Sequence, residues 1–381
     1  MERAQARHWA RKLGSMIRNE IRTRPQRIAA LALLALVTAI GLWSCQSAPR
    51  SGKAMVPLSS EPEVRIRIKN GVASTKLAGP GEMVIQPRTG KPAVLPGPLT
   101  IAATSTGCTV TDSKGKAHTF AGLEPLDIVP MGEGSSDEGL ATRMKVDGVS
   151  YPGNIRILPR GESVKSGATS GQPATAPKLD VIEMIPMETY LAGVVGAELF
   201  KDWPETAFKV QAVCARTYAL HERERANSQG RDFDLESTTA DQAYNGGAHL
   251  PVAVKAVSET QGVVITWQGR LLRAYYSSTC GGRTASAADI WPTGPGYEFN
   301  LDQPIQAHHR QSACEISPRY RWEAVRDRVE LSKRVKEWGR ANAHAVAKLG
   351  LINLVSITNY NVDGRPTVYL IADDQKKTYS I

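Results

Sequence analysis

Glu188-Thr-Tyr-Leu-Ala-Gly-Val-Val-Gly-Ala-Glu198-Leu199 is the part of this 381-residue chain that most clearly sets its architecture. Leu191, Val194, Val195 and Leu199 recur at i, i+3, i+4 and i+8, a spacing that predicts a helix with one apolar face. Glu198 falls beside that face in the last turn. A single carboxyl group at the end of an apolar helix is a candidate for acid/base chemistry, which makes Glu198 a candidate site residue.

Further helices are predicted after this one. A second helix is expected to start with Asp202-Trp-Pro-Glu205, where an acid in a capping position precedes Pro and Glu. Its buried stripe contains small residues that allow another element to pack closely, and Arg216 lies next to that stripe. A third helix is predicted over residues 251–260, and residues 321–349 are expected to be mainly helical.

Two β-hairpins are predicted in the same half of the chain. Residues 263–267 pair with 271–276, and residues 354–358 pair with 366–371, in each case across a turn that contains glycine. The second strand of the first hairpin leads directly into the glycine turn Ser277-Ser-Thr-Cys-Gly-Gly-Arg-Thr284. This turn is therefore expected to lie at the end of a strand.

Residues 62–185 have the pattern of a β-rich region. Apolar and polar residues alternate with period two in short stretches that Gly, Pro and Asp-Ser turns interrupt. These stretches are 64–69, 83–86, 99–102, 108–111, 126–129 and 154–158. Together with the helices and hairpins of residues 186–381, they predict an α+β protein. Its helical catalytic core has β-hairpins and a preceding or inserted β-rich domain, behind an N-terminal membrane anchor.

The N-terminal residues indicate export. Residues 1–27, a basic cytoplasmic flank, hold eight basic and two acidic residues and so account for six of the ten net positive charges. The following segment, residues 28–45, is an uncharged apolar run that ends in Ser-Cys, a secretory or signal-anchor pattern. Leu42-Trp-Ser-Cys45 resembles a bacterial lipobox, so lipidation at Cys45 and an uncleaved anchor are both open. Residues 46–61 are a Ser- and Pro-containing linker.

The location of the charge also bears on partners. Since most of the excess positive charge lies in the N-terminal flank, the folded part has no basic excess typical of a nucleic-acid-binding protein. The domain is expected outside the cytoplasm, anchored to the bacterial cytoplasmic membrane or lipidated. Nucleic acid is not a predicted partner.

Four cysteines follow the membrane segment: Cys108, Cys214, Cys280 and Cys314. An oxidising compartment permits up to two disulfides among them, in three possible pairings. Cys108 lies in a strand-like run and Cys214 in a helix interior, so both are expected to be small buried residues. Cys280 stands beside two glycines and suits a disulfide, for example with Cys314.

Four blocks of the sequence together resemble the stage II sporulation protein D family, also called the SpoIID/LytB domain. Their order, content and spacing match over residues 181–291, and the resemblance is looser on either side. The blocks are Tyr190-Leu-Ala-Gly-Val-Val-Gly-Ala-Glu198, Trp203-Pro-Glu-Thr-Ala-Phe-Lys-Val-Gln-Ala-Val-Cys-Ala-Arg-Thr-Tyr-Ala219, Asp241-Gln-Ala-Tyr-Asn-Gly246, and Ala274-Tyr-Tyr-Ser-Ser-Thr-Cys-Gly-Gly-Arg-Thr284 with Asp289-Ile-Trp291.

The resemblance implies a lytic transglycosylase that cleaves the MurNAc–GlcNAc linkage of peptidoglycan glycan strands, preferably strands stripped of peptides. Glu198 corresponds to the catalytic acid of the family. The residues that correspond to its substrate-binding positions and motifs are Arg216, Gln242, Tyr244, Tyr276, Ser278, Thr279 and Cys280. For Arg216, a salt bridge that joins the two helices is an equal alternative, and the Cys280-Gly-Gly282 turn could be structural.

One carboxyl group is enough for this reaction. A glycosidase with two carboxylates needs the second as nucleophile or base, whereas in a lytic transglycosylase the 6-hydroxyl of the sugar attacks and closes a 1,6-anhydro ring. An apolar setting made by Leu199, Phe200 and Trp203 would keep the Glu198 carboxyl protonated for the first step.

Three features depart from the family pattern. Some members bind zinc through Cys and His just before the Gln-x-Tyr motif, but residues 233–242 contain neither, so no metal or other cofactor is predicted. Ser277 stands where many relatives have His. The chain also ends at Ile381, before the closing segment expected of the family.

Two other functions compete with catalysis by Glu198. The domain could bind glycan without cutting it and activate a cell-wall amidase, since some relatives are called amidase enhancers. Alternatively, Cys280 could be a nucleophile assisted by His221 or His249, although no local motif supports these histidines.

Overall fold

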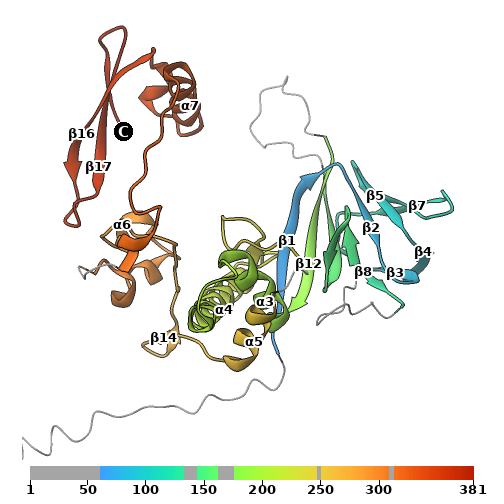
Figure 1. Ribbon diagram of the computed structural model, residues 1–381. Coiled ribbons are helices and arrows are strands. Elements are labelled where there is room, and N and C mark those ends of the chain that lie inside the picture. Colours follow the sequence, from blue (N-terminus) through green and yellow to red (C-terminus); the bar gives the residue numbers. More distant parts are fainter. Residues whose placement is uncertain (1–60, 133–143, 162–175, 247–249, 309–312) are drawn as a thin grey trace, which may run out of the picture. The chain divides into compact units, whose positions relative to one another are not determined.

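The computed structural model describes residues 61–132, 144–161, 176–246, 250–308 and 313–381. They form a mixed α/β protein with several sheets and few helices (Figure 1). The predicted flank, membrane segment and most of the linker lie outside the described residues. None of the helices in the described ranges has the length and apolar character needed to cross a membrane.

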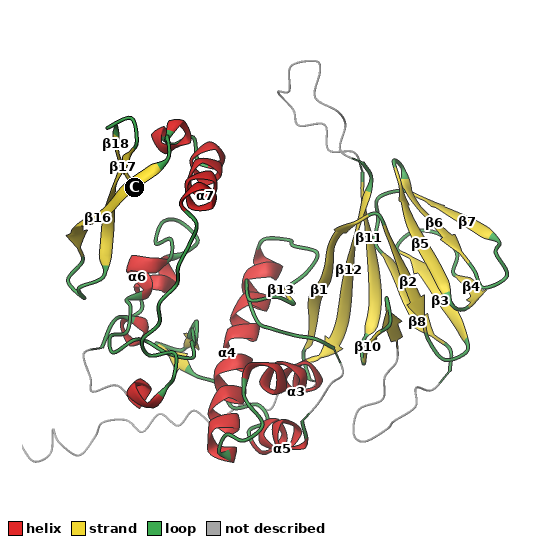
Figure 2. Ribbon diagram, turned by 45° about the horizontal axis from the view of Figure 1, so that its top comes forward, coloured by secondary structure: helices red, strands yellow, loops and turns green. Residues whose placement is uncertain are grey.

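Two mainly antiparallel sheets contain the strands that precede the first helix and one short strand that follows the second helix (Figure 2). The first has the strand order β13-β1-β12-β11-β8-β3-β4, in which β13 alone pairs in parallel with its neighbour, and the second has the order β10-β9-β2-β5-β6-β7. The strands are β1 (Glu63–Val72), β2 (Ser74–Ala78), β3 (Glu82–Pro87), β4 (Ala93–Pro96), β5 (Leu99–Thr104), β6 (Gly107–Thr111), β7 (Ala117–Ala121), β8 (Leu126–Pro130), β9 (Met144–Val146), β10 (Val149–Tyr151), β11 (Asn154–Arg160), β12 (Lys178–Pro186) and β13 (Leu235–Glu236).

Side-chain burial follows the predicted alternation. In β1, Val64, Ile66 and Ile68 are buried while the residues between them are partly exposed, because successive side chains point to opposite faces of a sheet. All six predicted strands are present. The remaining strands of this region were missed because most are short or lack a clear alternation. Cys108 is buried in β6, as predicted, and burial raises the pKa of its thiol to about 11.

The strand β12 connects the sheets to the helices. From Leu179 to Ile185 every residue is buried, and α3 (Met187–Glu198) begins directly after it. Helices α4 (Glu205–Ser228) and α5 (Pro251–Glu259) pack against α3, and α3 and α4 also contact the first sheet (Figure 1). One hydrophobic core therefore runs from the β-rich region into the helices.

The second helix starts later than predicted. Pro204 occupies the N-cap of α4, and the first turn closes through a hydrogen bond from Ala207 N–H to the Pro204 carbonyl at 2.8 Å. Asp202 therefore makes no capping bond, and the predicted cap is wrong. The interior residue Cys214 of this helix is only partly buried, whereas the sequence predicted it to be buried.

The first predicted hairpin is much shorter than expected. Only β14 (Thr266–Trp267) and β15 (Arg270–Leu271) pair, and the ladder ends after a bond from Leu272 N–H to Ile265 O at 3.1 Å. Beyond it the side chains of Arg273 and Tyr275 bond to partners outside the hairpin, which draws this segment away from a two-stranded ladder.

The C-terminal residues have a small core of their own, around Val346, Leu349, Ile352 and Ile371. The predicted hairpin is confirmed, with a third strand added. Residues 321–349 are helical only in part. The elements between β15 and the C-terminus are α6 (Ala287–Ile290), the 3-10 helices η1 (Glu298–Leu301), η2 (Gln303–Ile305), η3 (Ala313–Ile316) and η4 (Ala345–Lys348), α7 (Arg328–Ala341), β16 (Ile352–Tyr360), β17 (Pro366–Asp373) and β18 (Thr378–Ser380).

Candidate active site

Glu198 is the last residue of α3, and its carboxylate is held by two donors from distant segments. The Ala243 N–H donates to Glu198 Oε1 at 2.9 Å, and the Tyr276 hydroxyl donates to the same oxygen at 3.4 Å. Within the described part of the chain Oε2 has no hydrogen-bond partner, and the residue is partly exposed. Three of the four sequence blocks thus meet at one carboxyl group, with one oxygen fixed and one accessible.

The surroundings of this carboxyl differ from the predicted apolar setting. Phe200 is 72% exposed and Trp203 is 43% exposed, and their rings pack against each other at 6.1 Å between centroids. The chain turns away from the helix axis at Leu199, which has an extended backbone conformation, so the two aromatic residues do not enclose Glu198. Polar donors set its environment instead.

Gln242 connects these donors to the helices. It is fully buried, and its Oε1 accepts a hydrogen bond from the Tyr190 hydroxyl at 3.0 Å. Its Nε2 donates to Ala215 O and to Tyr276 Oη, each at 3.2 Å. Burial, and next the negative charge of Glu198, raise the pKa of Tyr276, so this hydroxyl keeps its proton and remains a donor. Gln242 therefore positions Tyr276 rather than facing a cleft.

Tyr244 lies on the other side of the same loop and is almost completely buried. Its ring packs against Tyr190, with centroids 5.0 Å apart. Gly193 makes room for it, because a Cβ at that position would lie 2.6 Å from the Tyr244 ring. In this structure Tyr244 is thus part of the core that supports the loop, and its predicted contact with substrate stays a prediction.

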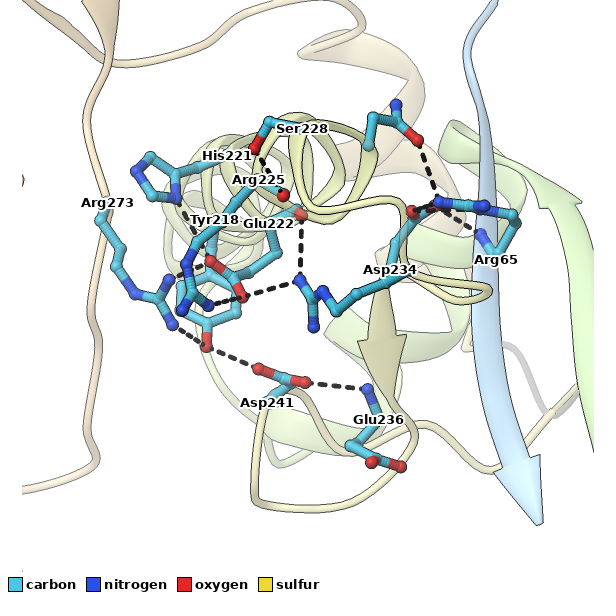
Figure 3. Close-up of polar contacts among 12 residues, drawn as sticks. Arg65, Tyr218, His221, Glu222, Arg225, Ser228, Asp234, Glu236, Asp241 and Arg273 are labelled. Atoms are coloured by element: carbon cyan, nitrogen blue, oxygen red, sulfur yellow. Dashed lines mark hydrogen bonds and ion pairs between the residues drawn. The ribbon is translucent and has the colours of Figure 1, made fainter. Parts of the chain in front are cut away.

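A second network holds the loop at Asp241 (Figure 3). The Tyr218 hydroxyl donates to Asp241 Oδ1 at 2.9 Å, and the Glu236 N–H donates to Oδ2 at 2.8 Å. Arg273 donates from Nη2 to the Tyr218 hydroxyl oxygen at 3.0 Å and also forms an ion pair with Glu222. Because Ala243 follows Asp241 by two residues, this network helps to set where the Ala243 N–H points.

Glu222 is the centre of this second network. Its carboxylate is buried and contacts the side chains of His221, Arg225, Arg231 and Arg273. Burial raises the pKa of Glu222, but His221, Arg273 and Arg225 together lower it by more, so the carboxylate is the stable form. Sequence reasoning missed Glu222 and Arg273, since Arg273 reaches its partners Glu222 and Tyr218 across 51 and 55 residues.

Arg216 is buried between the helices. Its Nε and Nη2 donate to the two carboxylate oxygens of Glu188 at 2.8 and 2.6 Å. It also donates to the backbone oxygens of Ala212, Val257 and Val263 at 3.1 to 3.5 Å. This is the intramolecular salt bridge that the sequence left as an alternative to substrate binding, and it joins α3, α4 and the end of α5.

The segment after Tyr276 is more exposed. Ser277 and Ser278 face solvent, and the Thr279 and Ser317 hydroxyl oxygens lie 3.2 Å apart. The sulfur atoms of Cys280 and Cys314 are 3.7 Å apart, which places together the two cysteines that the sequence suggested as a pair.

The sequence also offered Cys280 as a nucleophile assisted by His221 or His249. His221 contacts Glu222 and the ring of Phe299, whereas Cys280 contacts Cys314, and His249 lies outside the described residues. In the described ranges no three or more His, Cys, Asp and Glu side chains gather as metal ligands would.

Comparison with known proteins finds a family similarity in the part of the chain that contains Glu198. Residues 175–267 match the family model SpoIID, described as stage II sporulation protein. An uncharacterized protein of Brachyspira hyodysenteriae is 30% identical over 153 residues, which are 40% of this chain and 37% of that protein.

Two relatives from Bacillus species have informative names. The amidase enhancer of Bacillus subtilis is 34% identical over 107 residues, 28% of this chain and 14% of that protein. The stage II sporulation protein D of Bacillus amyloliquefaciens is 28% identical over 138 residues, 32% of this chain and 40% of that protein. The chain thus spans two fifths or less of the length of these relatives.

Proposed function

Because residues 175–267 carry a SpoIID domain, as the sequence motifs predicted, we propose that this protein is a lytic transglycosylase of peptidoglycan, with Glu198 as its general acid/base. The observation that carries the proposal is the Glu198 carboxyl group. The Ala243 N–H and the Tyr276 hydroxyl hold its Oε1, and its Oε2 is left accessible. No second carboxylate is required by this chemistry, since the substrate supplies the nucleophile.

The reaction would proceed in two proton transfers at Glu198. The protonated carboxyl group donates its proton to the oxygen that links MurNAc to GlcNAc, and the bond from the MurNAc anomeric carbon to that oxygen breaks. The MurNAc 6-hydroxyl oxygen then bonds to the anomeric carbon, and the carboxylate accepts the hydroxyl proton. The products are a 1,6-anhydro-MurNAc end and a free GlcNAc 4-hydroxyl, and the carboxyl group is again protonated.

The proposed substrate is a glycan strand stripped of peptides, and the proposed location is outside the cytoplasmic membrane, reached through residues 28–45. Ser278, Thr279 and Cys280 would contact the strand beyond Glu198. Tyr276 is partly buried and contacts Gln242 and Glu198, so its role would be to orient the catalytic carboxyl group.

The direct test is chemical analysis of the products. Purified protein is incubated with peptide-free glycan strands, and anhydro-muramic ends are measured by mass spectrometry. We expect wild type to form such ends and Glu198→Gln to lose at least about a hundredfold in rate, since loss of a general acid typically costs that much. Glu224→Gln, an exposed acid on α4, is the control and should retain full activity.

A second function is supported by the name of one relative, the Bacillus subtilis amidase enhancer. In this alternative the domain binds glycan and stimulates a cell-wall amidase without cutting the strand itself. If wild type and Glu198→Gln both bind strands, both stimulate a purified amidase, and neither forms anhydro ends, the transglycosylase proposal is wrong and this alternative replaces it.

A further inference from the structure

A cavity of about 580 Å³ begins at the Thr279-Cys280-Gly-Gly282 turn. Thr279 follows Tyr276, which contacts Glu198, by three residues. Three residues of extended backbone span at most about 10 Å, so the cavity begins within that distance of Tyr276. The walls carry the side chains of Arg283, Arg319, Tyr320, Arg321, Trp322 and Arg365. The catalytic proposal above makes no use of these six residues.

The glycine turn shapes this cavity. Gly282 has φ +99°, a conformation that favours glycine, and a Cβ there would lie 2.6 Å from the Tyr320 hydroxyl oxygen. The absence of a side chain lets Tyr320 approach the turn. Arg321 stacks on the Tyr320 ring, with its guanidinium carbon 4.1 Å from the centroid, and donates to Gly281 O at 3.1 Å. The glycine turn and residues 319–322 thus pack against each other.

The charge of the cavity is strongly positive. Four arginines line it and no acidic side chain does. Arg283 and Arg365 donate to the backbone oxygens of Asp363 and Arg283 at 3.0 and 2.5 Å. In the described part of the chain none of the four is ion-paired with a carboxylate, and the buried Arg365 Nε has no hydrogen-bond partner. A concave surface with a single sign of charge concentrates ions of the opposite sign.

The cavity also offers an apolar surface. Trp322 is 80% exposed, and Tyr320 is partly exposed. Aromatic rings next to arginines suit a ligand that combines a ring with apolar C–H faces and an anionic substituent. Among the groups of a glycan strand, an N-acetylmuramic acid residue whose lactyl carboxylate is free of peptide fits this description. When a peptide is attached, the same carboxyl group is a neutral amide.

We propose that this cavity is a binding subsite for the free lactyl carboxylate of a muramic acid residue in the strand. The arginines bind the carboxylate, and Trp322 and Tyr320 contact the sugar ring. This proposal rests on the proposed function, because its ligand is part of a glycan strand. The cavity residues would select strands that are free of peptide. Arg319 and Arg321, the two exposed arginines of the 319–322 segment, are the residues to test.

Binding is measured by isothermal titration calorimetry with the full chain carrying Glu198→Gln, so that no strand is cut. The two probes are peptide-free glycan strands and chitohexaose, which has the same backbone of N-acetylated sugars without carboxylates. We expect peptide-free strands to bind more tightly than chitohexaose, with an advantage that shrinks as salt increases. Adding Arg319→Gln and Arg321→Gln should weaken strand binding about tenfold and leave chitohexaose binding unchanged.

The matched control is the pair Arg326→Gln and Arg334→Gln, which removes the same charge from exposed positions outside the cavity. The subsite proposal is wrong if the Glu198→Gln protein with all cavity arginines intact binds the two probes equally well. It is also wrong if the control pair of substitutions weakens strand binding as much as the cavity pair does. Circular dichroism and thermal unfolding establish that all variants are folded.

Failure of the subsite can be told apart from failure of the proposed function. If wild type cuts the strands but binding does not depend on the lactyl carboxylate, the subsite proposal is wrong and the transglycosylase proposal stands. Binding that depends on the carboxylate without any formation of anhydro ends would support the subsite and overturn the transglycosylase.

Discussion

Glu183 is a buried carboxyl group that the catalytic proposal does not use. It lies in β12, and its Oε1 accepts a hydrogen bond from the Gly153 N–H at 2.7 Å. Its Oε2 is buried, and Tyr244 is the titratable side chain next to this carboxyl group. Burial raises the pKa of Glu183 from the usual 4.5 to about 7, because the ionised form would lose its hydration.

This shift predicts how stability depends on pH. Since the folded state holds the Glu183 proton up to a pKa of about 7 and the unfolded state releases it near 4.5, the stabilisation is complete below pH 4.5 and is lost as pH rises to about 7. The loss amounts to about 3 kcal/mol. Urea unfolding of wild type and Glu183→Gln at pH 5 and pH 8 should show a smaller pH dependence for the variant. An equal dependence in both proteins would contradict the assignment.

At the scale of elements, the helices depend on Arg216. Its guanidinium joins Glu188 at the start of α3 to backbone oxygens near the end of α5 and just beyond it. Substrate binding by the same group would require some of these bonds to break. The two roles predicted from the sequence therefore have different experimental signatures.

We expect Arg216→Met to destabilise the fold by about 3 kcal/mol, because removing one partner leaves the largely buried Glu188 carboxylate unpaired. Chemical denaturation measures this loss. Lys209→Met, on the exposed face of the same helix, is the control and should change stability little. A variant with unchanged stability and lost glycan binding would instead assign Arg216 to the substrate.

The loop that carries Ala243 gives a second prediction at this scale. Tyr218→Phe removes the hydroxyl group that bridges Arg273 and Asp241, so the Ala243 N–H should be less well placed on Glu198. We expect kcat to fall about tenfold with a smaller change in KM. The control Tyr379→Phe removes a hydroxyl bond to Lys348 O, which no residue of the site shares, and should leave both constants unchanged. A change in KM alone would contradict a positioning role.

For the whole molecule, the proposed location follows from the N-terminal 45 residues. The basic flank and the apolar segment should direct the full chain to the membrane fraction of bacterial cells, with the folded part accessible to protease from outside. Deletion of residues 1–45 should leave the protein in the soluble fraction. Cys45→Ser distinguishes lipidation at Cys45 from an uncleaved membrane anchor, because the substitution abolishes lipidation but retains an uncleaved anchor. A full chain that stays in the cytosol would contradict the proposal.

Much of the candidate site follows from local sequence. The spacing of Leu191, Val194 and Val195 predicts α3, and the acid at its end identifies Glu198 without any knowledge of its partners. The alternation in residues 62–158 predicts strands for the same reason, since both patterns are set by the period of a single element. The family motifs add the order of the blocks.

Tertiary structure decided what these residues contact. The use of Gln242 to orient Tyr276, the contact of Tyr276 with Glu198, and the burial of Arg216 against Glu188 join segments that lie from 28 to 78 residues apart in the sequence. Such contacts leave no periodic trace in the sequence. The chain by itself determined which group could do the chemistry, and the packing of distant segments decided which oxygen of that group is held and which is left for a substrate.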